Sequence, residues 1–103
     1  MDERERQYRQ MIEEFPDSPL PWFSLGRLLL ETARFEEAVE ALQRCIDADP
    51  EYAAALLAQG DALAAIDEKE RAREVWARCE KAALAQGHPT LAAEARERAE
   101  ELD

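Results

Sequence analysis

The sequence is poor in the residues from which many functional sites are built. It has two cysteines, three glycines and one histidine among 103 residues. Cys45 and Cys79 are too few and too far apart for a disulfide framework or a set of metal ligands. The glycines stand alone, so the chain has no glycine-rich phosphate loop. His88 lies between Gly87 and Pro89, where we expect a solvated turn residue rather than a catalytic base.

Positive charge and long apolar runs are also scarce. The chain has 24 acidic and 13 basic residues, for a net charge of −11. Such a field repels phosphate backbones and anionic lipids, so we expect neither a nucleic acid nor a membrane as partner. No apolar run approaches the ~20 residues that a membrane span needs, and the N-terminal MDERERQYRQ lacks the apolar core of a signal peptide. We therefore expect a cytoplasmic protein, with its acidic excess serving solubility.

Groups that could perform chemistry are isolated from one another. We can place no base beside any of the few serine, threonine or tyrosine hydroxyls. Adjacent carboxylates such as Glu13 and Glu14 point apart on a helix and face solvent. The sequence thus predicts no catalytic, cofactor or metal site, and an enzyme is the least supported class.

The residues that are abundant favour helix. Alanine, glutamate, leucine and arginine dominate, asparagine is absent, and lysine occurs only at positions 69 and 81. This composition disfavours sheet. A length of 103 residues fits one domain, residues 1–103. We expect an all-α fold.

The chain also repeats itself at a spacing of 34 residues. Residues 19–52 align with residues 53–86 without a gap. Because several identities fall on glycine, cysteine and leucine, shared alanine richness does not explain them. Extending the frame backwards aligns Pro16 with Pro50, so residues 2–16 form half a repeat. The eight identical pairs are Gly26/Gly60, Leu29/Leu63, Glu36/Glu70, Ala38/Ala72, Glu40/Glu74, Arg44/Arg78, Cys45/Cys79 and Ala48/Ala82.

Apolar spacing and capping residues predict six helices. The first carries a stripe at i, i+3, i+4 and i+7, which we expect to pack on a neighbour: Tyr8, Met11, Ile12 and Phe15. The second helix is expected at 19 to about 31, with Ser18 as N-cap, and the third at 35–48. The fourth is expected at about 51–66 after a cap at Asp49. The fifth is expected at 67–86, with a capping box of Asp67 and Glu70. The last, 89–102, has one thin apolar stripe and is expected to cap the stack.

Two of the glycines and both cysteines recur one period apart inside helices. A helical glycine costs roughly 1 kcal/mol relative to alanine, so a packing gain must offset it. We expect Gly26 to face Ala38, and Gly60 to face Ala72, where two helix backbones approach closely. The cysteines are interpreted as small packing residues between helices rather than redox groups.

The first full repeat resembles a known family. It contains W-x2-L-G-x2-L from Trp22 to Leu29, A-x3-L from Ala38 to Leu42, and then Pro50. This pattern resembles the tetratricopeptide repeat (TPR). The resemblance implies a right-handed solenoid of helical hairpins: a half repeat (2–16), two full repeats (19–52 and 53–86) and a capping helix (89–102).

The resemblance also implies where a partner binds. In this family the first helix of each repeat lines a concave groove that holds a peptide or a helix of a partner. An apolar or amphipathic helix suits the residues that this chain places there. Carried over position by position, the groove is lined by Leu20, Phe23, Ser24, Arg27, Leu30, Glu31, Ala54, Leu57, Ala58, Asp61, Ala64 and Ala65.

The second helix is apolar nearly all round, so its outer face needs a cover. A partner segment, a second copy of the chain or the chain's own C-terminal helix could supply it. The first hypothesis is therefore a non-enzymatic protein-interaction module, and the alternative is a homo-oligomerisation module, such as a homodimer. The acidic tails bound by one branch of the family are not expected, because asparagine is absent and Phe23, Ser24, Arg27 and Ala58 occupy the corresponding sites. A domain of a longer repeat protein is a third reading.

Overall fold

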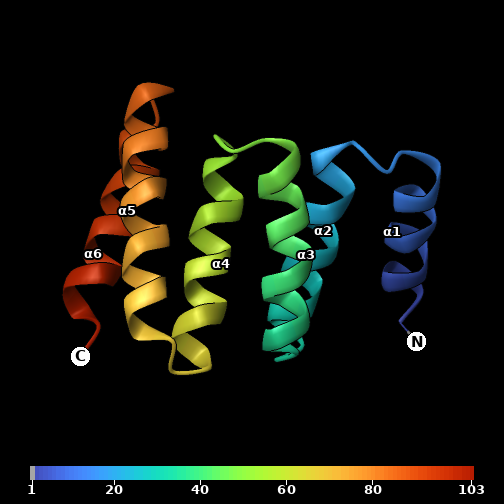
Figure 1. Ribbon diagram of the computed structural model, residues 1–103, viewed down its shortest axis with the longest axis horizontal. Coiled ribbons are helices and arrows are strands. Elements are labelled where there is room, and N and C mark those ends of the chain that lie inside the picture. The colour runs from blue at the N-terminus through green and yellow to red at the C-terminus, as the bar shows by residue number, and fades with distance from the viewer. Residues whose placement is uncertain (1) are drawn as a thin grey trace.

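The computed structural model describes residues 2–103, in which six α-helices follow one another and no strand occurs. The all-α prediction is confirmed. Figure 1 shows the helices standing side by side from the N-terminal to the C-terminal end of a body of 37 × 28 × 19 Å. The helices are α1 (Glu3–Glu14), α2 (Pro19–Glu31), α3 (Phe35–Ala48), α4 (Ala53–Ala65), α5 (Lys69–Ala85) and α6 (Pro89–Glu101).

The helices form two layers. α2 and α3 make one hairpin and α4 and α5 the next, with α1 before them and α6 after them. α2 contacts α4, and α4 contacts α6, whereas α1, α3 and α5 do not touch one another within residues 2–103. The inner layer therefore consists of α2, α4 and α6. This is the arrangement that a stack of helical hairpins requires.

Left-handed residues end the first helix of each hairpin. Ala33 and Asp67 have φ of 60° and 64°, and the next amide donates to the carbonyl five residues back, at 2.8 Å for Arg34 N and Leu29 O. The predicted capping box at Asp67 is therefore wrong: Asp67 closes α4, and Glu68 is the N-cap of α5. Aspartate tolerates this conformation better than most residues. Gly87 takes the same role after α5, with φ of 77°.

Of the two other predicted caps, one is confirmed and one is wrong. Ser18 is the N-cap of α2 as predicted, although its side chain makes no capping hydrogen bond. Asp49 does not cap the fourth helix, because it ends α3 and a turn follows in which Tyr52 N donates to Asp49 O. Tyr52 is the N-cap, so α4 begins at Ala53 rather than near Glu51. Local hydrogen bonding in the turn thus delays the helix start.

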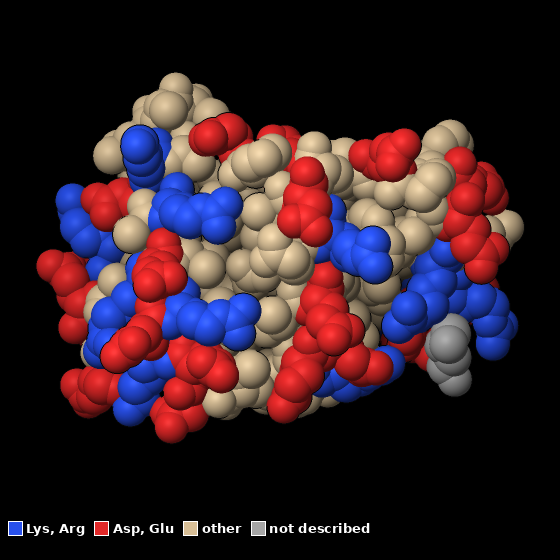
Figure 2. Space-filling model, viewed as in Figure 1, with Lys and Arg blue, Asp and Glu red and all other residues tan. Residues whose placement is uncertain are grey.

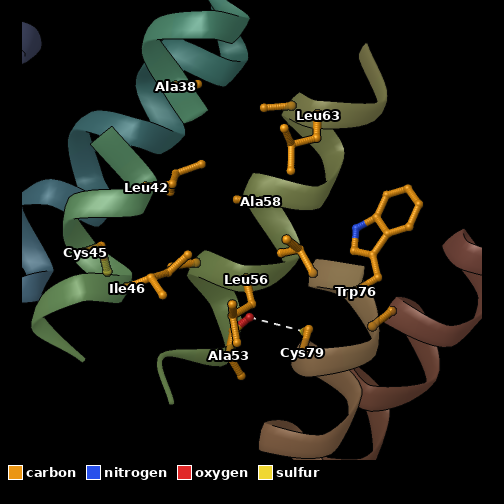
Figure 3. Packing of buried hydrophobic residues seen from close by; sticks show 14 of the residues in the cluster. Ala38, Leu42, Cys45, Ile46, Ala53, Leu56, Ala58, Leu63, Trp76 and Cys79 are labelled. Atoms are coloured by element: carbon orange, nitrogen blue, oxygen red, sulfur yellow. Dashed lines mark hydrogen bonds between the residues drawn. The ribbon is translucent and has the colours of Figure 1, made fainter. Parts of the chain in front are cut away.

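The helical glycines make room for large side chains. A Cβ built on Gly26 would lie 2.5 Å from Cγ and Cδ2 of Leu42 and 3.4 Å from its backbone N, so the predicted close backbone approach is also present there. One built on Gly60 would fall within 3.0 Å of three atoms of the Trp76 indole. The predicted partners, Ala38 and Ala72, are fully buried but are not the groups that need the space. Figure 3 shows Leu42 and Trp76 reaching toward the core from α3 and α5. Long helical side chains lean toward the helix N-terminus, which brings them over the glycines.

Both cysteines are packing residues. Cys45 and Cys79 are free thiols with no exposed area. The Cys79 thiol donates a hydrogen bond to Ala53 O at 3.2 Å, drawn as the dashed line in Figure 3. Burial raises the pKa of Cys45 to about 12 and that of Cys79 to about 11. Neither thiol has the lowered pKa of a reactive cysteine.

The N-terminal helix is held by an ion-pair network. Glu5, 3% exposed, accepts hydrogen bonds from Arg34 Nη1 at 2.6 Å and Nη2 at 3.2 Å, and from Arg9. The hydrogen bonds from Arg34 hold the pKa of Glu5 below its ordinary value, although burial acts in the opposite direction. The apolar stripe of this helix packs only in part, because Met11 is 42% and Phe15 58% exposed. Within residues 2–103, α2 is the only helix whose backbone lies close to that of α1.

Candidate functional site

The inner faces of α2 and α4 carry the residues that the sequence predicted for a groove. Four of the twelve predicted residues are exposed, seven are partly buried and one is buried. The exposed ones are Leu20, Arg27, Glu31 and Ala65; the partly buried ones are Phe23, Ser24, Leu30, Ala54, Leu57, Asp61 and Ala64; the buried one is Ala58, at 5%. Ala58 therefore belongs to the floor of this face, and the other eleven side chains reach its surface.

An apolar strip runs along this face. Leu20 is 54% exposed, and Phe23, Leu30 and Leu57 pack with one side on the hydrophobic core. The Phe23 ring lies against that of Tyr52, with centroids 5.1 Å apart and planes inclined by 37°. This aromatic pair joins α2 to the start of α4 and gives the strip a preformed centre.

Most charges on the face are already paired. Arg27 lies 3.8 Å from Glu31 and 5.9 Å from the centre of the Phe23 ring. Asp61 is 3.1 Å from Arg98 of α6. Burial raises the pKa of Asp61 against the lowering effect of Arg98. These charges need no ligand to neutralise them.

The C-terminal helix does not cover the apolar part of the face. α6 contacts α4 and α5 but not α2 within residues 2–103. Leu20, Phe23 and Leu30 therefore have no cover from α6, and that candidate from the sequence analysis is wrong. Figure 1 shows α6 at the opposite end of the row from α1.

Sequence reasoning missed two residues of the face. Tyr52 and Leu91 line a cavity of about 400 Å³ between the start of α4 and the start of α6. Leu91 lies 34 residues after Leu57, which lies 34 after Phe23, so the repeat could have identified it. Tyr52 lies in the connection before α4, where the helical pattern carries no signal.

The face of the molecule seen in Figure 2 shows no strong segregation of charge. Figure 2, in the orientation of Figure 1, shows acidic and basic side chains interleaved, without a continuous basic patch on that side. Of the helices between residues 2 and 103, none is both long and apolar enough to traverse a bilayer. The described residues contain no group of three or more histidine, cysteine or acidic side chains placed to hold a metal ion. The chemistry available on the inner face is thus apolar contact and ion pairing.

Comparison with known proteins agrees with this architecture. The family model for the tetratricopeptide repeat matches residues 5–59. A TPR repeat-containing protein of Pseudomonas aeruginosa is 36% identical over 67 residues, which are 65% of this chain and 64% of that relative's length.

Solved structures show the same fold. A Bordetella parapertussis protein, known from its solution structure, has a TM-score of 0.84 and 25% identity, over 99% of this chain and 89% of that one. The TPR2B domain of yeast Sti1, in its complex with pHsp70, has a TM-score of 0.76 and 20% identity, over 91% and 81%. YrrB, described as a TPR protein with an unusual peptide-binding site, has a TM-score of 0.67 and 18% identity, over 93% and 57%. With a family model that covers more than half of its residues and six helices stacked as hairpins, this chain belongs to the tetratricopeptide repeat family.

Proposed function

We propose that this protein is a non-enzymatic interaction module that binds a peptide or a helix of a partner protein along the inner face of α2 and α4. The observation that carries the proposal is the partly exposed apolar strip at Leu20, Phe23, Leu30 and Leu57, which no part of the described chain covers. Exposed apolar patches often mark binding sites. In its most concrete form, the proposal is an apolar or amphipathic helix lying in this groove.

Family likeness supports the proposal. One similar fold was solved in a complex with pHsp70, and another is described as having a peptide-binding site.

We further assign residues 2–16 as a half repeat, 19–52 and 53–86 as full repeats, and 89–102 as a capping helix. The cytoplasmic location expected from the sequence stays a prediction.

Leucine-to-glutamate variants test the groove with a matched control. Leu20 on the inner face and Leu84 on α5 are 54% and 57% exposed, so Leu20→Glu and Leu84→Glu carry the same chemical change at similar exposure. Partners captured by the wild type should be retained by Leu84→Glu and lost by Leu20→Glu and by Leu57→Glu. Far-UV circular dichroism and melting temperature establish that each variant is folded. Equal capture by all three variants would contradict the groove assignment.

Self-association is the alternative, and one observation favours it. In the part of the chain that the structure describes, three of the four exposed large apolar side chains lie on α1, at its end or at the start of α2: Met11, Phe15 and Leu20. A second copy could cover them in a homodimer. Sedimentation at several protein concentrations separates the two proposals, because a strict monomer rules out the dimer.

A further inference from the structure

Two carboxylates beside the groove differ from the other charges of the inner face. Arg27 pairs with Glu31, and Asp61 with Arg98. Asp49 and Glu51, in the connection between α3 and α4, form no ion pair within residues 2–103. Among these groups, only Asp49 and Glu51 lack an ion-pair partner, and both are negative. Arg78 and Lys81 line a neighbouring cavity with Glu51, but in the described part of the chain neither forms an ion pair with it.

The two carboxylates border a cavity that also has apolar lining. Asp49 and Glu51 line the cavity of about 400 Å³ together with the apolar or aromatic residues Tyr52, Ala53, Ala54 and Leu91 and the polar residues Gln86 and His88. The carboxylate of Asp49 accepts a hydrogen bond from the Glu51 backbone amide at 3.1 Å. Gln86 also lines the cavity, but it donates to the Glu51 backbone carbonyl, at 2.6 Å, and not to its carboxylate.

The cavity continues the apolar strip. The Tyr52 ring that lines it packs on Phe23, and Leu91 occupies on α6 the repeat position that Phe23 and Leu57 occupy on α2 and α4. A ligand along α2 and α4 would therefore reach the cavity without leaving the face. At that point it would meet an apolar surface rimmed by negative charge.

We propose that the occupant of the groove is an amphipathic segment of a basic partner, and that one of its arginine or lysine side chains enters this cavity. This inference rests on the function proposed above. The alkyl stem would lie along Tyr52 and Leu91, while the cationic head would reach Asp49 and Glu51. An arginine or lysine side chain therefore offers an apolar stem to Tyr52 and Leu91 and a positive charge to the two carboxylates.

The charge of the whole protein selects the same class of occupant. A net charge of −11 attracts a cationic segment and speeds its encounter with the groove. The same charge disfavours a second copy of the chain, because each copy carries a net charge of −11 and the two repel one another. An acidic segment would be repelled for the same reason.

Three synthetic helical peptides test the preference. They share one leucine face and differ only in their polar face, which carries lysine, glutamine or glutamate. Binding is measured by fluorescence anisotropy on the full chain at one ionic strength near physiological. We expect the affinity to fall from the lysine peptide to the glutamine peptide to the glutamate peptide.

Matched protein variants separate the local carboxylates from the net charge. Asp49→Asn with Glu51→Gln, and Glu40→Gln with Glu74→Gln, each remove two negative charges and change the net charge from −11 to −9. Glu40 and Glu74 are exposed on α3 and α5, in the outer layer. Asn at position 49 retains the oxygen that accepts the backbone hydrogen bond. We expect the first pair to weaken lysine-peptide binding about threefold to tenfold, and the second pair less than twofold.

Each other outcome has a defined meaning. Equal weakening by the two double variants would overturn the inference, because net charge alone would then explain the attraction. Equal affinity for the lysine and glutamine peptides, lost in Leu20→Glu, would overturn it and leave the groove function intact. If none of the three peptides binds, both proposals fail. A dimer that excludes the lysine peptide would assign the face to a second copy.

Discussion

Gly60 carries the sharpest prediction about packing. Replacing it with alanine gains roughly 1 kcal/mol of helix propensity. The new Cβ would lie within 3.0 Å of the Trp76 indole, and overpacking of this kind costs about 1–3 kcal/mol. Moving the indole also weakens the hydrogen bond from Trp76 Nε1 to Leu57 O, 3.2 Å long, and an unsatisfied buried donor costs about 1–3 kcal/mol. The expected net loss for Gly60→Ala is about 1–5 kcal/mol.

Urea denaturation followed by far-UV circular dichroism measures this loss. The melting temperature should fall by roughly 4–8 °C for each kcal/mol in a domain of this size. Near-UV circular dichroism should change as well, because the indole of Trp76 must shift. Gly87→Ala is the control: apart from Gly87 and its two neighbours in the chain, no residue has an atom within 4 Å of the added Cβ. Its φ of +77° costs about 1 kcal/mol by backbone strain alone.

A double-mutant cycle tests the cause. In a Trp76→Ala background the clash is absent, so Gly60→Ala should become neutral or stabilising. The same loss in both backgrounds would refute the packing argument. A gain of about 1 kcal/mol in the wild-type background would refute it too, because that is the behaviour of an exposed helical glycine.

The remaining predictions concern ionisation and backbone conformation. The pKa of Glu5 is lowered in the folded state, so its ionised carboxylate stabilises the fold above the unfolded pKa near 4.5. This stabilisation is lost as the pH falls through the folded pKa. Between about pH 5 and pH 3, the free energy of unfolding should therefore fall more for the wild type than for Glu5→Gln. Ala33→Gly should stabilise by about 0.5–1 kcal/mol in urea, because glycine removes the strain of a φ of 60°, and a loss would contradict this. Cys45 and Cys79 should react with a thiol reagent at pH 8 only as fast as the protein opens, and rapid labelling of the native state would contradict their burial.

Helices and their repeat could be predicted from the sequence because both depend on local patterns. Apolar spacing and prolines placed α2 within one residue of its observed ends and α6 within one residue of Glu101. The spacing of 34 residues identified Gly26 and Gly60 as equivalent, and the structure places a large side chain over each. The predicted starts at 19, 35 and 89 coincide with those of α2, α3 and α6, because a helical hydrogen bond joins residues only four apart.

Contacts between distant segments could not be predicted in the same way. Arg34 and Glu5 are separated by 29 residues, and nothing in either segment's own pattern indicates that they meet. Asp67 was misread for a related reason: an acidic residue before a helix suggests an N-cap, but the ending of the previous helix required a left-handed residue there. The candidate groove was named residue by residue from the family pattern, whereas the cavity at Tyr52 and Leu91 was not.

The sequence by itself determined that this chain forms helices of known length in a repeating order, because helix formation depends on interactions within a few residues. Only the tertiary structure decided which side chain fills the space over each glycine and that α6 leaves the apolar strip of α2 open. It also decided that, within residues 2–103, Asp49 and Glu51 form no ion pair and border a cavity lined in part by Tyr52 and Leu91. These features depend on how far one helix is shifted and rotated against the next. That register is set by the packing of the whole core and not by any single segment.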